Sequence, residues 1–106
     1  MLDGSLDARA IDRVVDAFLH QWPQRRAALE LALDAADSNS LRETIHSLEG
    51  AVPYFGIERL NDALRRFQQF ARAEEIDAAR SAYPELATLV EELATSRDKH
   101  KGVKTA

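Results

Sequence analysis

The most informative stretch of this chain is residues 41–52, LRETIHSLEGAV. Its apolar residues recur four, three and four positions apart, which places them on one face of a helix. These residues are Leu41, Ile45, Leu48 and Val52. His46 lies about 100° round the helix from Ile45, at the edge of the apolar stripe, and Gly50 follows one turn later. We therefore predict an amphipathic helix over about residues 38–53 that presents an imidazole to solvent.

The rest of the chain repeats this helical periodicity and has no β-alternation of useful length. The pattern predicts further helices over about residues 7–21, 23–36, 57–72 and 75–96. Pro23 separates the first two, and Pro53 with Gly56 favours a turn near residues 53–56. Short connections make successive helices antiparallel neighbours. The predicted fold is therefore all-α, an up-and-down antiparallel four-helix bundle with an additional N-terminal helix.

Length and composition predict one globular domain. The chain has 106 residues, of which 45% are hydrophobic and 30% charged. We divide it into a bundle domain over residues 1–96 and a basic, flexible C-terminal tail over residues 97–106. It has no apolar run long enough to span a membrane, no visible signal peptide and no cysteine. These features predict a cytoplasmic protein without membrane contact.

Charge and residue spacing argue against several classes of function. The net charge is −4 and all three lysines lie in the last eight residues, so the body is acidic and unsuited to nucleic acid. Three scattered histidines without cysteine give no usual zinc spacing, so no metal site is predicted. Neither a paired acid and base nor a phosphate-cradling loop is present to indicate an enzyme with a substrate pocket. His46 stands out, because an exposed imidazole can act as a nucleophile.

The segment His46-Ser47-Leu48-Glu49-Gly50-Ala51, followed by Gly56 and Leu60, resembles the motif of histidine-containing phosphotransfer (HPt) domains. The likeness covers most of residues 10–95. It implies a phosphorelay intermediate: His46 accepts a phosphoryl group from a receiver-domain aspartate and passes it to another receiver. Such a protein is a phosphocarrier rather than an autonomous kinase, and it has no cofactor, because the receiver brings the aspartate and the magnesium ion. The implied partners are response-regulator receiver domains or a hybrid sensor histidine kinase, and we expect a monomer.

The resemblance also implies roles for residues around His46. In the family, a polar side chain of the following helix commonly steadies the imidazole or the phosphate. Gln68 falls at such a position, between Arg65 and Arg72 on the same side of its helix. Together with Arg42, one turn before His46, these side chains are expected to orient or stabilise phosphohistidine. The residues expected to govern access and docking are Ser47, Glu49, Gly50 and Pro53.

Two positions depart from the family pattern. Glu49 stands where the family usually has lysine. Its charge would oppose each unit of phosphate charge about 6 Å away by roughly 0.7 kcal/mol in water. This repulsion weakens phosphate retention several-fold without preventing transfer. Pro53 is expected to shorten or bend the histidine helix just beyond the site.

Three other interpretations stay open at this point. A lone histidine on an amphipathic helix is more often structural than catalytic. Glu49 also suits a degenerate HPt-like binding or inhibitory module that docks a signalling partner without phosphotransfer. Long amphipathic helices can form intermolecular dimerisation bundles as well. The register of Leu48, Gly50, Gly56 and Leu60 with His46 favours the relay over these alternatives.

Overall fold

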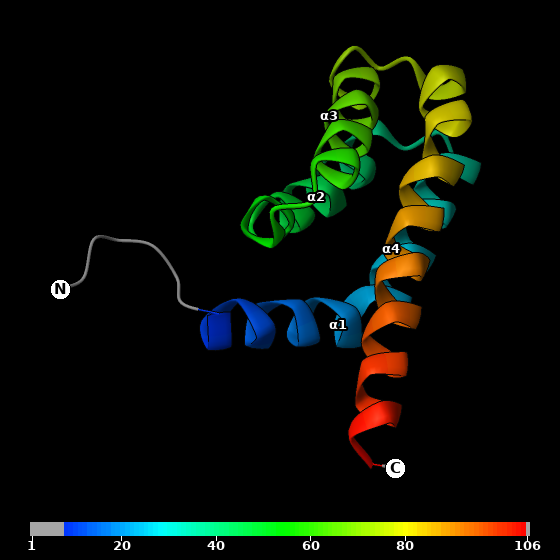
Figure 1. Cartoon of the computed structure of the whole chain (residues 1–106). Coiled ribbons are helices and arrows are strands. Elements are labelled where there is room, and N and C mark those ends of the chain that lie inside the picture. The colour runs from blue at the N-terminus through cyan, green and yellow to red at the C-terminus, as the bar shows by residue number, and fades with distance from the viewer. Residues whose placement is uncertain (1–7, 106) are drawn as a thin grey trace, which may run out of the picture.

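A computed structural model describes the backbone of residues 8–105 and the side chains of residues 8–98. The elements are α1 (Ala8–Asp34), α2 (Ser38–Glu49), the 3-10 helix η1 (Val52–Phe55), α3 (Glu58–Arg72) and α4 (Ile76–Thr105). α1 packs on α2, α2 on α3 and α3 on α4, and α1 also contacts α4 (Figure 1). No strand occurs in the described part of the chain. The predicted all-α fold is confirmed, and residues 8–105 form four α-helices rather than the five predicted.

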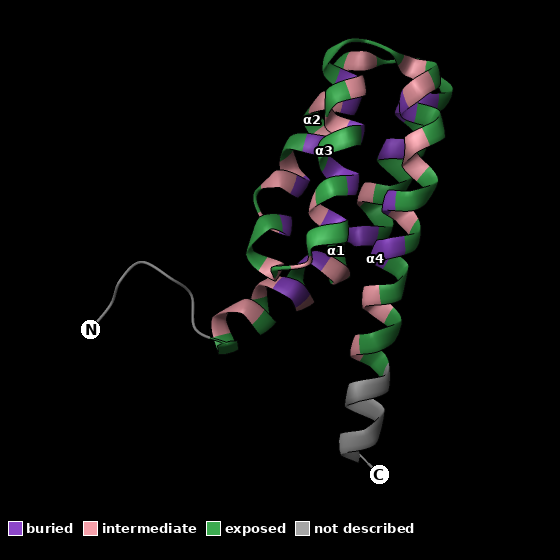
Figure 2. Ribbon diagram, turned by 45° about the horizontal axis from the view of Figure 1, so that its top comes forward, coloured by how far each residue is buried: buried purple, intermediate pink, exposed green. Residues whose placement is uncertain are grey.

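The core lies where the apolar stripes of the helices meet (Figure 2). Its largest fully buried side chains come from every α-helix and from η1: Leu29, Leu41, Ile45, Leu48, Val52, Leu60, Phe67, Leu86 and Val90. The stripe predicted around His46 is therefore buried at all four positions, and each of them is at most 2% exposed. Burying side chains of this size stabilises a fold by about 1.5–3 kcal/mol each. The buried stripe holds α2 rigidly against its neighbours. The side chains on the exposed face of α2 are therefore held in a fixed position as well.

α1 differs most from the prediction, because the expected N-terminal helix is not a separate element. A single helix runs through Pro23, where we predicted a break or a new start. Figure 1 shows that α1 changes direction along its length: its first half lies across one end of the bundle and its second half runs beside the other helices. Proline removes one helical hydrogen bond and bends a helix without necessarily ending it. Buried Trp22 and Leu29, before and after the proline, pack in the same core and keep both halves helical.

Two turns between helices use left-handed residues other than glycine. Ala36 (φ 54°) follows α1 and Glu74 (φ 58°) follows α3. At the first turn, Asp37 N donates to Ala32 O and Ala36 N to Leu33 O, at 2.9 and 3.2 Å. The same pair of bonds recurs around Glu74. Both turns are thus Schellman C-caps, which end α1 and α3 and satisfy carbonyl groups of their last turns.

Polar side chains link α1 to α4 along their length. Trp22 Nε1 donates to Glu91 Oε2 at 2.8 Å, and Arg80 Nη2 caps the end of α1 by donating to Leu33 O at 2.7 Å. Arg97, which we assigned to the tail, belongs to α4 and contacts Asp12 and Asp16 of α1 at 3.0 and 2.8 Å. The three lysines of the predicted tail lie outside the described side chains, so its flexibility stays a prediction.

No helix in the described residues combines the length and the apolar character that crossing a membrane would require.

Candidate functional site

The imidazole of His46 projects into solvent from a rigid helix. Its side chain is 86% exposed, whereas the adjacent Ile45 is 2% exposed and Leu48 is fully buried. The ring therefore has room on its outer side for a large molecule to approach. An ordinary structural histidine packs its ring instead, so this geometry disfavours the structural interpretation.

Local signals at both ends define the histidine helix. Asp37 is the N-cap: its carboxylate accepts hydrogen bonds from Ser40 Oγ at 2.7 Å and from Ser40 N at 3.1 Å. These two hydrogen bonds hold the pKa of the Asp37 carboxyl below its usual value of 3.8. At the other end α2 stops at Glu49, and Pro53 lies in the first turn of η1. The histidine helix is therefore shorter than its predicted range of 38–53 and ends four residues earlier. This agrees with the expectation that Pro53 shortens it.

A shallow hollow of about 190 Å³ lies beside the ring of His46, between α2 and α3. Its lining residues are Arg42, Ile45, His46, Glu49, Gln68, Ala71 and Arg72. The fold thus brings Arg42, Gln68 and Arg72 together around one imidazole, although 30 residues separate Arg42 from Arg72 in the sequence. A larger hollow of about 550 Å³ on α4 has no imidazole among its described lining residues.

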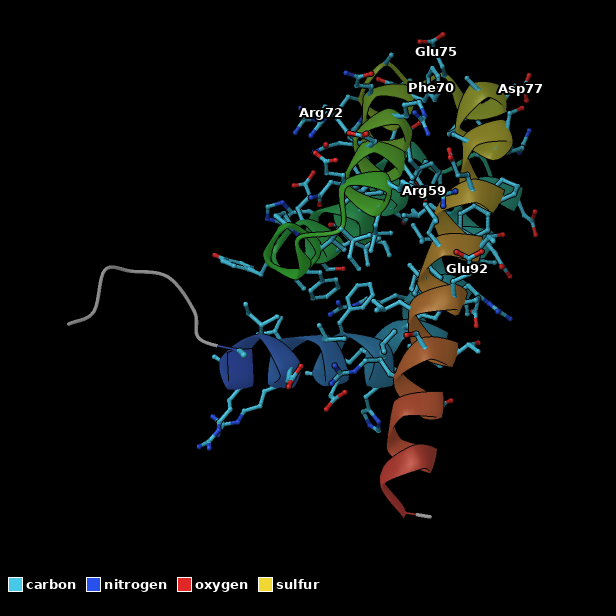
Figure 3. All side chains as sticks on the ribbon, viewed as in Figure 1. Arg59, Phe70, Arg72, Glu75, Asp77 and Glu92 are labelled. Atoms are coloured by element: carbon cyan, nitrogen blue, oxygen red, sulfur yellow. The ribbon has the colours of Figure 1, made fainter. Side chains whose placement is uncertain are left out.

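Two guanidinium groups border the hollow in different states. Arg42 is engaged, since its Nη2 donates to Asn39 Oδ1 at 2.6 Å and its Nη1 lies 3.9 Å from Glu74 Oε2. Arg72 is exposed, and its guanidinium makes no hydrogen bond or ion pair with any other described residue. Figure 3 shows Arg72 projecting from the end of α3 on the side away from α4. It is therefore a cation that is free to meet an anion arriving at this face.

Glu49 contacts the ring of His46 directly. Its Oε1 lies 3.3 Å from Nδ1 of the imidazole, three residues earlier on the same helix. The Glu49 side chain is 27% exposed, far less than the ring that it contacts. The sequence placed Glu49 on the same face as His46, but this contact depends on the rotamers of two side chains. The contact with the ring is additional to the roles we had expected for Glu49, which were to oppose a phosphate and to govern access and docking.

Arg65 does not line the hollow of His46. It borders a second hollow of about 200 Å³, lined also by Glu49, Pro53, Asn61, Leu64 and Gln68. Its Nη1 donates to Asp62 Oδ1 at 3.0 Å, and both side chains are exposed. The predicted stripe of Arg65, Gln68 and Arg72 is therefore divided between two neighbouring hollows. Pro53 belongs to the second one.

The two small residues near His46 have different surroundings. Ser47 Oγ donates to Thr44 O at 2.6 Å, so its hydroxyl is engaged with its own helix. Gly50 is exposed and has an ordinary helical φ of −74°. A Cβ at this position would meet only Ser47 O, at 3.8 Å, and would not reach the imidazole. No contact within 4 Å of such a Cβ therefore requires glycine at position 50.

A comparison with known protein families identifies the class of domain that carries this site. The family model described as Hpt domain matches residues 13–96. The chain belongs to the Hpt domain family. No curated protein and no solved structure gave a match. As an Hpt domain, the chain is a phosphotransfer module of two-component signalling, in a family whose members carry phosphoryl groups and interact with receiver domains and histidine kinases.

Proposed function

We propose that this Hpt domain is a phosphorelay intermediate in the cytoplasm, with His46 as the residue that carries the phosphoryl group. His46 Nε2 attacks the phosphorus of a receiver's aspartyl phosphate. The new N–P bond forms as the P–O bond breaks, and the aspartate leaves with the electron pair as a carboxylate. The reverse reaction, with the aspartate of a second receiver as nucleophile, completes the relay.

The observation that carries this proposal is the 86% exposed imidazole on a helix whose opposite face is fully packed. Phosphoryl transfer has little covalent chemistry for a protein to assist, so it depends on positioning and on charge. A rigid helix supplies the positioning. The large exposed fraction supplies access for a partner that must bring its own aspartate within bonding distance of the ring.

Three side chains of the hollow are suited to the charge of phosphohistidine. Arg72 has no partner among the described residues, and Arg42 can turn to phosphoryl oxygens by exchanging its hydrogen bond to Asn39 and its 3.9 Å contact with Glu74. Gln68 can donate a neutral hydrogen bond from the opposite helix. Hydrogen bonds from charged donors contribute about 1.5–3 kcal/mol each when they are desolvated. We assign Arg42, Gln68 and Arg72 to orienting and retaining the phosphoryl group.

The receiver completes the reacting centre. It contributes the aspartate and a magnesium ion that neutralises the phosphoryl oxygens, and we assign no residue of this chain to hold that ion. The docking surface is the face of α2 and α3 around His46, where exposed Gly50 leaves clearance for the partner. Because relay partners must dissociate after each transfer, we expect a small, transient interface and a monomeric protein.

Phosphoryl transfer assays test this proposal. The purified protein is incubated with phosphoramidate, a small phosphoryl donor, and with a panel of receiver domains phosphorylated by acetyl phosphate. We expect an acid-labile, base-stable phosphate that is absent from His46→Gln. His20→Gln is the matched control, because His20 is also exposed but lies on α1. Label that persists in His46→Gln, or that never appears from any donor, would refute the assignment.

A further inference from the structure

We propose that Glu49 is a positioning residue, which holds the proton of His46 on Nδ1 and so leaves the lone pair of Nε2 directed at the phosphoryl donor. The contact that supports this inference lies within this chain and does not require a partner protein. Its consequence for phosphotransfer rests on the function proposed above.

The first support is the geometry of the pair. Glu49 Oε1 lies 3.3 Å from His46 Nδ1, which is within reach of a charge-assisted hydrogen bond. The imidazole is the sole ion-pair partner of Glu49 among the described residues. The two arginines of the hollow do not compete for it: Arg42 binds Asn39 and Glu74, and Arg72 lies beyond ion-pair distance.

The second support is the burial of the two partners. The Glu49 side chain is 27% exposed and the His46 side chain 86% exposed, so Glu49 is the better-packed partner. It belongs to the last turn of α2, immediately after fully buried Leu48. A carboxylate fixed in this way can orient a ring that is otherwise free to rotate.

Hydrogen-bonding chemistry then selects the tautomer. An ionised carboxylate only accepts, and a neutral imidazole carries one N–H. The nitrogen that faces Glu49 must therefore be the donor, so Nδ1 carries the hydrogen and Nε2 carries the lone pair. When Nε2 forms the bond to phosphorus, the ring becomes a phosphoimidazolium that keeps its hydrogen on Nδ1. Glu49 faces the positive charge that develops, and in the reverse step it keeps the ring protonated as a good leaving group.

This role accounts for an acidic residue where a lysine is usual. The carboxylate contacts the near nitrogen of the ring, whereas the phosphoryl group is attached to the far one. Coulomb energy falls with distance, so attraction to the ring cation exceeds repulsion from any single unit of phosphoryl charge. Glu49 therefore repels the phosphoryl oxygens but attracts the ring cation that forms when Nε2 bonds to phosphorus.

Nitrogen-15 NMR of the imidazole tests the inference without any partner. At mildly alkaline pH, we expect His46 of the wild-type protein to be mainly the Nδ1–H tautomer. Glu49→Ala should shift it towards the Nε2–H form, and Glu49→Gln, which keeps an uncharged acceptor, should lie between. Glu43→Ala is the matched control, since Glu43 is an exposed residue of α2 that lines a different hollow.

Transfer rates provide the second measurement. Loss of the hydrogen bond in Glu49→Ala should slow labelling of His46 by a phosphorylated receiver about fivefold, with no change in Glu43→Ala. A wild-type ring that is mainly Nε2–H, or a tautomer unchanged in Glu49→Ala, would overturn the inference while His46 still took up phosphate. Absence of label from every protein, including the wild type, would instead refute the proposed function, whatever the tautomer.

Discussion

The same substitution at two glycines should have opposite effects on stability. Gly56 has φ 70° and ψ 24°, in the left-handed region, and a Cβ there would meet nothing within 4 Å. The cost of Gly56→Ala is therefore that of the backbone alone, about 1–2 kcal/mol. Gly50 has φ −74° and ψ −14°, and its added Cβ would lie 3.8 Å from the nearest atom. Gly50→Ala should stabilise the protein by about 0.4–1 kcal/mol, because alanine has less freedom to lose on folding.

Thermal unfolding followed by circular dichroism measures both effects. We expect the melting temperature to fall by roughly 5–10 °C in Gly56→Ala and to rise by about 2–5 °C in Gly50→Ala. If Gly50→Ala proved as damaging as Gly56→Ala, the argument that no internal contact requires glycine at position 50 would be refuted. A stable Gly50→Ala also provides the background for Gly50→Phe, which should slow transfer from a receiver while sparing labelling by phosphoramidate.

Three further predictions concern the turns, the N-cap and the phosphate site. Ala36→Gly should raise the melting temperature, because Ala36 holds a left-handed φ of 54° that glycine adopts freely. Asp37→Asn keeps the N-cap but removes its titration. Because the pKa of Asp37 is lowered from 3.8 on folding, its ionised form stabilises the protein above pH 3.8, and this stabilisation is lost as the pH falls through the folded value. The advantage of wild type over Asp37→Asn in pH-dependent melting should therefore disappear in acid. Arg72→Gln should shorten the lifetime of phosphohistidine about threefold at low salt and less at high salt, measured by loss of label, with exposed Arg59→Gln as the matched control.

The helices themselves were predictable because their signals are local. The apolar spacing of Leu41, Ile45, Leu48 and Val52 identified the buried face of α2, and all four side chains are in the core. The same spacing left His46 on the exposed side, where the structure has it. Gly56 and its left-handed turn were also predictable, since only glycine adopts that conformation without strain.

Other features depended on contacts that no local pattern records. Pro23 looked like a helix boundary, but packing on both sides of it kept α1 continuous. The sequence gives no signal for a left-handed residue at Ala36 or Glu74. These residues adopt that conformation at the C-caps of α1 and α3, where Schellman hydrogen bonds form. Arg65 shares the helical face of Gln68 and Arg72, yet the crossing of α2 and α3 directs it to a separate hollow.

By itself, the sequence determined an all-helical chain, the helix that carries His46 and the exposure of its imidazole, because periodicity along a helix sets which side chains face the core. The tertiary structure alone decided which residues surround that imidazole. Arg42 and Arg72 meet at one hollow because α2 packs against α3, and Glu49 contacts Nδ1 because packed Leu48 and the end of α2 fix its position. The distances between helices, and the rotamers of side chains at the helix edges, are set by three-dimensional packing. Packing depends on residues far apart in the sequence, so no local pattern predicts it.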